Sequence, residues 1–167
     1  MIHPKAHVTD STIGEGTKVW QFASVIRGSV LGRDCVVASG ALIDGAVFGD
    51  RCIVAQNCAI GPGFKFGNDV FVGPNVVFVN DGFPSTDKDG FDYDALRSGR
   101  WVILVDDGAI IGANATIMPG IHLYKNSVVA AGAVCKKDVP ENCMMLRSGE
   151  IIRKPEDWKN RRMRWAK

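Results

Sequence analysis

The feature that most constrains this chain is a six-residue period of apolar residues along most of its length. The periodic positions are Ile13, Val19, Val25, Leu31, Val37, Ile43, Phe48, Val54, Ile60, Phe66, Val72, Phe78, Val105, Ile111, Ile117, Leu123, Val129 and Cys135. The residue two places earlier is usually small, and glycine often follows the apolar residue. Neither a helix nor simple strand alternation has this period. Short strands joined by tight, glycine-tolerant corners do, so the period predicts a parallel β-helix whose coils bury one another.

Two segments carry a resemblance to a known family. The start of the chain, IHPKAHVTDSTIGEGTKVWQFASV, and the segment NDVFVGPNVVFVNDGFP resemble hexapeptide acyltransferases, and within them the sugar-nucleotide N-acetyltransferases. The likeness extends to about Met145 and is strongest to enzymes acting on dTDP-3-amino-3,6-dideoxyhexoses, with UDP-3-amino-glucuronate acetyltransferases next. It implies an all-β, left-handed parallel β-helix, which is the exception to the usual right-handed crossover.

The repeat divides the chain into two parts. Residues 1–146 are expected to form the β-helix, interrupted by an inserted loop at 79–104 that is rich in Asp, Gly and Ser but contains aromatic residues. A long loop of this kind in a compact repeat is usually functional or disordered, and aromatic residues argue against simple disorder. Residues 147–167 are basic and are expected to be partly helical after Pro155.

Length, charge and cysteine spacing argue against a nucleic-acid-binding, membrane-spanning or zinc-binding protein. The 167 residues fit one domain with a net charge of +2 and no long basic run in the body, so nucleic acid is not an expected partner. No stretch is long and apolar enough for stable membrane insertion. Four of the five cysteines lie on inward positions and none has CxxC spacing, which favours a reduced, cytoplasmic protein without a zinc site. No metal is expected.

The candidate catalytic residues are Asn80 and Asp81, at the break in the repeat. Many hexapeptide O-acetyltransferases have a histidine base here, whereas this chain reads NDGFP. An amine acceptor needs no strong base if it arrives unprotonated, so the missing histidine indicates N-acetylation. The resemblance implies that both side chains hold the amine of the sugar. The alternative is that Asn-Asp-Gly is only a turn, which these residues also favour.

Other residues are assigned to the acceptor and the coenzyme. Phe83, Pro84, Gln21 and Arg27 are candidate substrate-binding residues, although packing explains aromatic neighbours of Gln21 and solvation explains a lone arginine equally well. The resemblance implies that late-coil backbone groups bind the pantetheine of acetyl-CoA and that nearby basic residues meet its phosphates. These positions are Gly112, Ala113, Ala131, Gly132, Ala133, Lys136 and Lys137.

The sequence hypothesis is therefore a homotrimeric, acetyl-CoA-dependent N-acetyltransferase acting on a nucleotide-linked 3-amino-sugar for surface polysaccharide biosynthesis, with dTDP favoured. The alternatives are a UDP-3-amino-sugar N-acetyltransferase, and an O-acyltransferase or longer-chain acyltransferase of the same fold. A hexapeptide carbonic anhydrase would need three converging histidines, which the central coils lack. A non-catalytic scaffold also remains open, because fold does not fix function.

Overall fold

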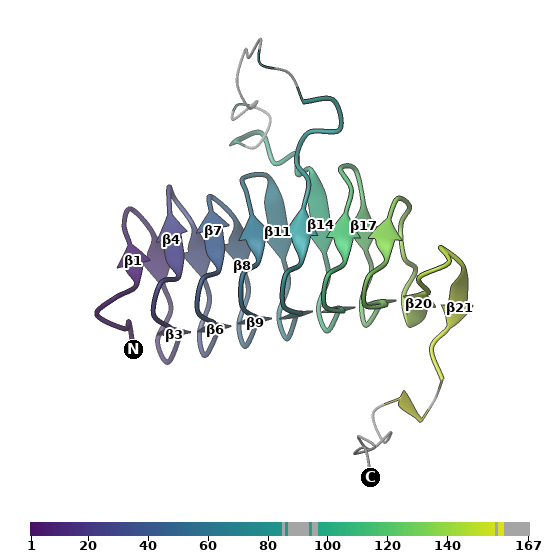
Figure 1. Ribbon diagram of the computed structural model, residues 1–167, viewed down its shortest axis with the longest axis horizontal. Helices are drawn as coiled ribbons and strands as arrows, with labels where there is room; N and C mark the ends of the chain where they lie inside the picture. Colours follow the sequence, from purple (N-terminus) through teal and green to yellow (C-terminus); the bar gives the residue numbers. More distant parts are fainter. Residues whose placement is uncertain (85, 87–93, 95–96, 156, 159–167) are drawn as a thin grey trace.

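A computed structural model describes residues 1–84, 86, 94, 97–155 and 157–158, and these form a parallel β-solenoid (Figure 1). The coils stack in chain order, and each contributes short strands to three sheets that form the faces of a prism and are parallel apart from one terminal strand pair. Val25 pairs with Ile43 in the next coil, three six-residue repeats further on. The all-β fold class predicted from the period is confirmed, and the hexapeptide coils are consistent with the left-handed class.

The first face is a seven-stranded parallel sheet. Its strands follow the order of the chain, with one strand from each coil. They are β1 (His7–Val8), β4 (Ser24–Ile26), β7 (Leu42–Asp44), β10 (Ala59–Ile60), β13 (Val77–Phe78), β16 (Thr116–Ile117) and β19 (Val134–Cys135).

The second face is a six-stranded parallel sheet, which the chain enters next in each coil. Its strands are β2 (Thr12–Ile13), β5 (Val30–Leu31), β8 (Val47–Phe48), β11 (Phe64–Phe66), β14 (Ile103–Val105) and β17 (His122–Leu123).

The third face is an eight-stranded sheet that closes each coil. Its last strand, β21, pairs antiparallel with β20 and so ends the solenoid. The strands are β3 (Lys18–Val19), β6 (Val36–Val37), β9 (Ile53–Val54), β12 (Phe71–Val72), β15 (Ile110–Ile111), β18 (Val128–Val129), β20 (Cys143–Met145) and β21 (Ile151–Arg153).

The core is the column of periodic apolar side chains. Phe48 and Phe66 stack with ring centroids 4.0 Å apart, and Phe78 meets Phe66 edge to face at 5.1 Å. Cys35 and Cys52 are buried among the small inward residues, as predicted. Each fully buried large side chain contributes roughly 1.5–3 kcal/mol of transfer free energy, so the repeat itself supplies most of the packing.

Two departures from the strict repeat are visible in the strand pairing. Val30 pairs with Val47, which is where the sequence period loses one residue. Phe64 pairs with Ile103 across the inserted segment. The loop boundary predicted at residue 104 therefore falls inside β14, because Ile103 and Leu104 already pair with residues of β11. The expected C-terminal helix falls largely outside the described residues.

Candidate functional site

The three corners between the faces differ in sequence, and each is named here by its content. The loop corner joins the seven- and six-stranded faces and carries the insertion (Figure 1). The Asp–Asn corner joins the six- and eight-stranded faces. The Gly–Ala corner joins the eight- and seven-stranded faces. The described residues of the loop corner include 27–29, 45–46, 61–63, 79–84, 97–102, 118–121 and 136–138. Those of the Asp–Asn corner are 14–17, 32–35, 49–52, 67–70, 106–109 and 124–127. Those of the Gly–Ala corner are 20–23, 38–41, 55–58, 73–76, 112–115 and 130–133.

Asn80 and Asp81 lie at the root of the insertion, directly after β13. Val79 donates its backbone N–H to the carbonyl of Ile117 at 2.9 Å, which fixes the point where the loop leaves the coil. The Asn80 side chain is half-buried against Gly61 of the preceding coil. Asp81 is exposed, and its Oδ1 accepts the N–H of Phe83 at 2.8 Å. The turn alternative is therefore partly realised, but it occupies only one carboxylate oxygen.

The remaining candidate acceptor residues divide between two corners. Phe83 and Pro84 are exposed beside Asp81, and the Phe83 side chain is 93% exposed. Arg27 lies on the same corner, where its Nε donates to Asp44 Oδ1 at 2.6 Å in a two-point ion pair with a buried carboxylate. This ion pair gives Arg27 a structural role, because a two-point contact between a guanidinium and a carboxylate holds both side chains in place. Gln21 lies on the Gly–Ala corner, away from the other three.

The Gly–Ala corner gathers most of the candidate coenzyme residues. A Cβ at Gly112 would lie 2.4 Å from the backbone nitrogen of Ala131, so close stacking of the coils explains this glycine. Within the described chain, the N–H groups of Ala113 and Ala131 donate no hydrogen bond. Gly132 is exposed, and Ala133 is buried with its side chain in the core. The corner thus offers backbone donors rather than side chains to a ligand.

The basic candidates near this corner are arranged differently from the sequence expectation. Lys136 and Lys137 follow β19 and are exposed on the loop corner, at the other edge of the seven-stranded face. Arg147 instead reaches the Gly–Ala corner, where its Nε donates to the carbonyl of Ala131 at 3.4 Å. Its guanidinium also lies beside Gly132. Arg147 therefore presents a cation at the end of the column of small residues.

One polar cluster was not singled out by sequence reasoning. The Nε2 of His122 lies 2.9 Å from Asp106 Oδ1, and its ring stacks on Tyr124 with centroids 3.8 Å apart. The backbone N–H of His122 donates to Asp138 Oδ1 at 2.8 Å. The signal that would have found this pair is the coil register, because Leu104 pairs with His122 and so brings Asp106 to the next coil.

Neither a metal-binding cluster nor a membrane-spanning helix occurs in the described part of the chain. Among the residues described, no group of three or more His, Cys, Asp or Glu side chains is placed to hold a metal ion. No helix in the described ranges has both the length and the apolar composition needed to cross a membrane.

Comparison with known proteins finds the repeats at both ends of the solenoid. Residues 10–45 match the family described as bacterial transferase hexapeptide (six repeats), and residues 102–136 match the hexapeptide repeat of succinyl-transferase. A bifunctional protein GlmU from Carboxydothermus hydrogenoformans is 29% identical over 162 residues, covering 92% of this chain and 34% of the relative. A GlmU from Lactococcus lactis is 28% identical and is covered to 31%. The chain spans about a third of the length of these curated relatives.

Solved structures share the fold at low sequence identity. LpxA from Bacteroides fragilis, a UDP-N-acetylglucosamine acyltransferase, gives a TM-score of 0.53 at 18% identity, covering 90% of this chain and 70% of LpxA. A variant of AntD, an N-acyltransferase from Bacillus cereus in complex with dTDP and coenzyme A, gives 0.51 at 14% identity, covering 95% and 83%. PerB from Caulobacter crescentus, in complex with CoA and GDP-perosamine, gives 0.50 at 20% identity, covering 86% and 51%. The chain therefore carries hexapeptide repeats and shares the fold of solved acyltransferases, among them an N-acyltransferase with dTDP and coenzyme A bound.

Proposed function

We propose that the chain is an acetyl-CoA-dependent N-acetyltransferase that acts on the 3-amino group of a nucleotide-linked sugar. The observation that carries the proposal is the loop corner, where Asn80 and Asp81 meet at the root of the insertion without a histidine. The dTDP-3-amino-3,6-dideoxyhexoses are the favoured acceptors, and UDP-3-amino-sugars are the alternative. The product would feed surface polysaccharide assembly in the cytoplasm.

The proposed chemistry needs few protein groups. The neutral amine attacks the thioester carbonyl carbon, the C–S bond breaks, and the thiolate of coenzyme A leaves. The second oxygen of Asp81 accepts no hydrogen bond from the described residues, so in this proposal it holds the amine and takes the proton that the amine loses. The amide of Asn80 orients the same amine. Positioning and proton transfer of this kind contribute roughly 10²–10⁴-fold in rate.

The Gly–Ala corner is the proposed path of the coenzyme. The N–H groups of Ala113 and Ala131, which donate no hydrogen bond within the described chain, suit the amide oxygens of pantetheine, and the exposed Gly132 adds no side chain along this path. Arg147 lies on this corner and is the better placed phosphate ligand, because its planar guanidinium binds phosphate oxygens in pairs. Lys136 and Lys137 would meet the same phosphates from the loop corner of an adjacent subunit in a homotrimer.

The test is release of coenzyme A thiol by the purified protein, with acetyl-CoA as donor and a panel of dTDP- and UDP-linked 3-amino-sugars as acceptors. Turnover with one sugar, and a strong loss in the Asn80→Ala variant, are the expected results. An absence of thiol release with every amine would overturn the proposal.

O-acyl transfer is a second candidate because the structure supplies a histidine with a carboxylate partner. His122 is held by Asp106 in the arrangement by which a carboxylate orients an imidazole base. This candidate predicts thiol release with hydroxyl acceptors and its loss in a His122→Gln variant. Turnover with amines that is unchanged in His122→Gln would exclude it.

A further inference from the structure

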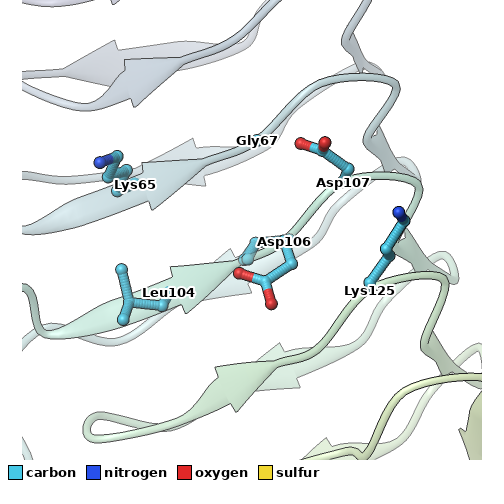
Figure 2. Close-up of a pocket in the computed structure, with 7 residues that line it drawn as sticks. Lys65, Gly67, Leu104, Asp106, Asp107 and Lys125 are labelled. Carbon is cyan, nitrogen blue, oxygen red and sulfur yellow. The ribbon is translucent and has the colours of Figure 1, made fainter.

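A pocket opens on the six-stranded face, at the end of the strands opposite to the loop corner. Its volume is about 330 Å³, within the range of roughly 300–1,000 Å³ typical of small-molecule sites. Figure 2 shows Lys65 and Leu104 toward one side, Asp107 and Lys125 toward the other, and Asp106 between them. Gly67 and Val105 complete the lining.

Two lysines supply the positive charge of this pocket. Within the described ranges, neither Lys65 nor Lys125 forms an ion pair. Lys65 Nζ lies 5.8 Å from the ring centroid of Trp101, a contact that positions the ammonium group without cancelling its charge. Two such ammonium groups beside one pocket attract a multiply charged anion such as a phosphate ester.

The two carboxylates are held in place and keep an acceptor atom. Asp106 Oδ1 meets His122, and Asp107 Oδ1 accepts the backbone N–H of Asn68 at 2.7 Å. The second oxygen of each carboxylate accepts no hydrogen bond from the part of the chain that the structure describes. Ionised carboxylates only accept hydrogen bonds, so their complement is a group rich in donors, such as sugar hydroxyls.

The combination of two lysines and two carboxylates restricts which kind of ligand can bind this pocket. A bare phosphate would face the two carboxylates, and a neutral sugar would leave both ammonium groups without a counter-ion. A molecule with hydroxyl groups on one part and a phosphate on another satisfies both sets. We infer that this pocket is a binding site for a phosphorylated sugar, separate from the corner that carries Asn80.

The experiment is titration of the full-length protein by isothermal calorimetry or NMR with three probes, namely glucose 1-phosphate, glucose and inorganic phosphate. We expect glucose 1-phosphate to bind at least tenfold more tightly than either other probe. A Lys65→Ala/Lys125→Ala double variant should lose at least tenfold in affinity. Lys18→Ala removes an exposed lysine on the eight-stranded face and should leave the affinity unchanged.

Three results would overturn the inference. The first is an absence of saturable binding by glucose 1-phosphate. The second is equal affinity for inorganic phosphate and glucose 1-phosphate, which would leave only a patch of positive charge. The third is an equal loss of affinity in Asn80→Ala, which would place the ligand at the loop corner instead. None of these results depends on whether the protein transfers an acetyl group.

Discussion

The Asp–Asn corner and the loop corner are both polar, but they use their polar atoms differently. At the Asp–Asn corner, Asp50 Oδ1 accepts the N–H of Arg33 at 2.8 Å, and Asn68 Oδ1 accepts the N–H of Asp50 at 2.8 Å. Asp107 accepts the N–H of Asn68 in the same way across the insertion, so these bonds form a ladder from coil to coil along the Asp–Asn corner. At the loop corner, Asp81 makes one local turn bond and keeps its second oxygen.

This difference separates polar side chains that hold the coils together from polar side chains that keep an atom for a ligand. Asp50 and Asn68 on the Asp–Asn corner join one coil to the next, so the fold explains their presence, whereas later residues of this corner, among them Asp106, Asp107 and Lys125, line a pocket. The acidic and amide side chains at the root of the loop stabilise little beyond their own turn. Polar composition alone does not distinguish the two corners, whereas the use of each donor and acceptor does.

The largest expected effect on stability comes from filling the Asp–Asn corner. A Cβ at Gly32 would lie 2.4 Å from the carbonyl oxygen of Gly49 and 2.5 Å from Asp50 Oδ1. Gly32→Ala should cost about 3 kcal/mol, because overpacking against backbone cannot relax easily. For a chain of this length that lowers Tm by roughly 6–12 °C in a thermal melt.

Gly82→Ala is the matched control at the loop corner. Its added methyl would lie 3.7 Å from Pro119, an ordinary contact. We expect a change in Tm of at most a degree or two. If both variants melt alike, the corners are not packed as differently as the structure indicates.

A smaller effect is expected when the ladder loses one carboxylate. Asp50→Ala removes acceptors of both the backbone N–H and the guanidinium of Arg33, the latter 3.1 Å from Oδ2. Its Tm should fall by less than that of Gly32→Ala, because the carboxylate is partly exposed and solvent replaces its partners. A Tm equal to or above that of the parent protein would argue that the ladder contributes nothing.

The smallest effect is on the pH dependence of stability. The backbone N–H and guanidinium of Arg33 lower the pKa of Asp50, and the guanidinium of Arg51 lowers the pKa of Asp69. Their contribution is complete above the unfolded-state pKa of about 4 and is lost as pH falls through the lower folded-state values. The Asp50→Ala/Asp69→Ala variant should therefore show a shallower fall in Tm between pH 5 and about pH 2. An unchanged slope would contradict this assignment.

The repeat made much of the fold predictable. A fixed period determines which residues point inward, and this places Cys35, Phe48 and Phe66 in the core without knowledge of their partners. The period also places the insertion at a corner, since Phe78 and Val105 are its last and next members. Corner angles follow from residue type, as at Asn57 with a φ of 57°.

The candidate site was less predictable, because it depends on contacts between coils. Lys136 is close to Gly132 in sequence but lies on a different corner, and Arg147 beyond the repeat reaches the Ala131 carbonyl. The partner of His122 is 16 residues earlier and becomes visible only in the coil register. The ion pair of Arg27 with Asp44 likewise requires the stacked structure.

The most direct test compares matched carboxylates on the two corners. The measurement is kcat/KM for thiol release from acetyl-CoA, with the nucleotide-linked 3-amino-sugar that supports turnover, for Asp81→Ala and Asp50→Ala. We predict that Asp81→Ala loses roughly 10²–10⁴-fold in kcat/KM with little change in Tm, whereas Asp50→Ala lowers Tm and stays within about threefold of the parent. Equal activity of Asp81→Ala and the parent protein would contradict the account.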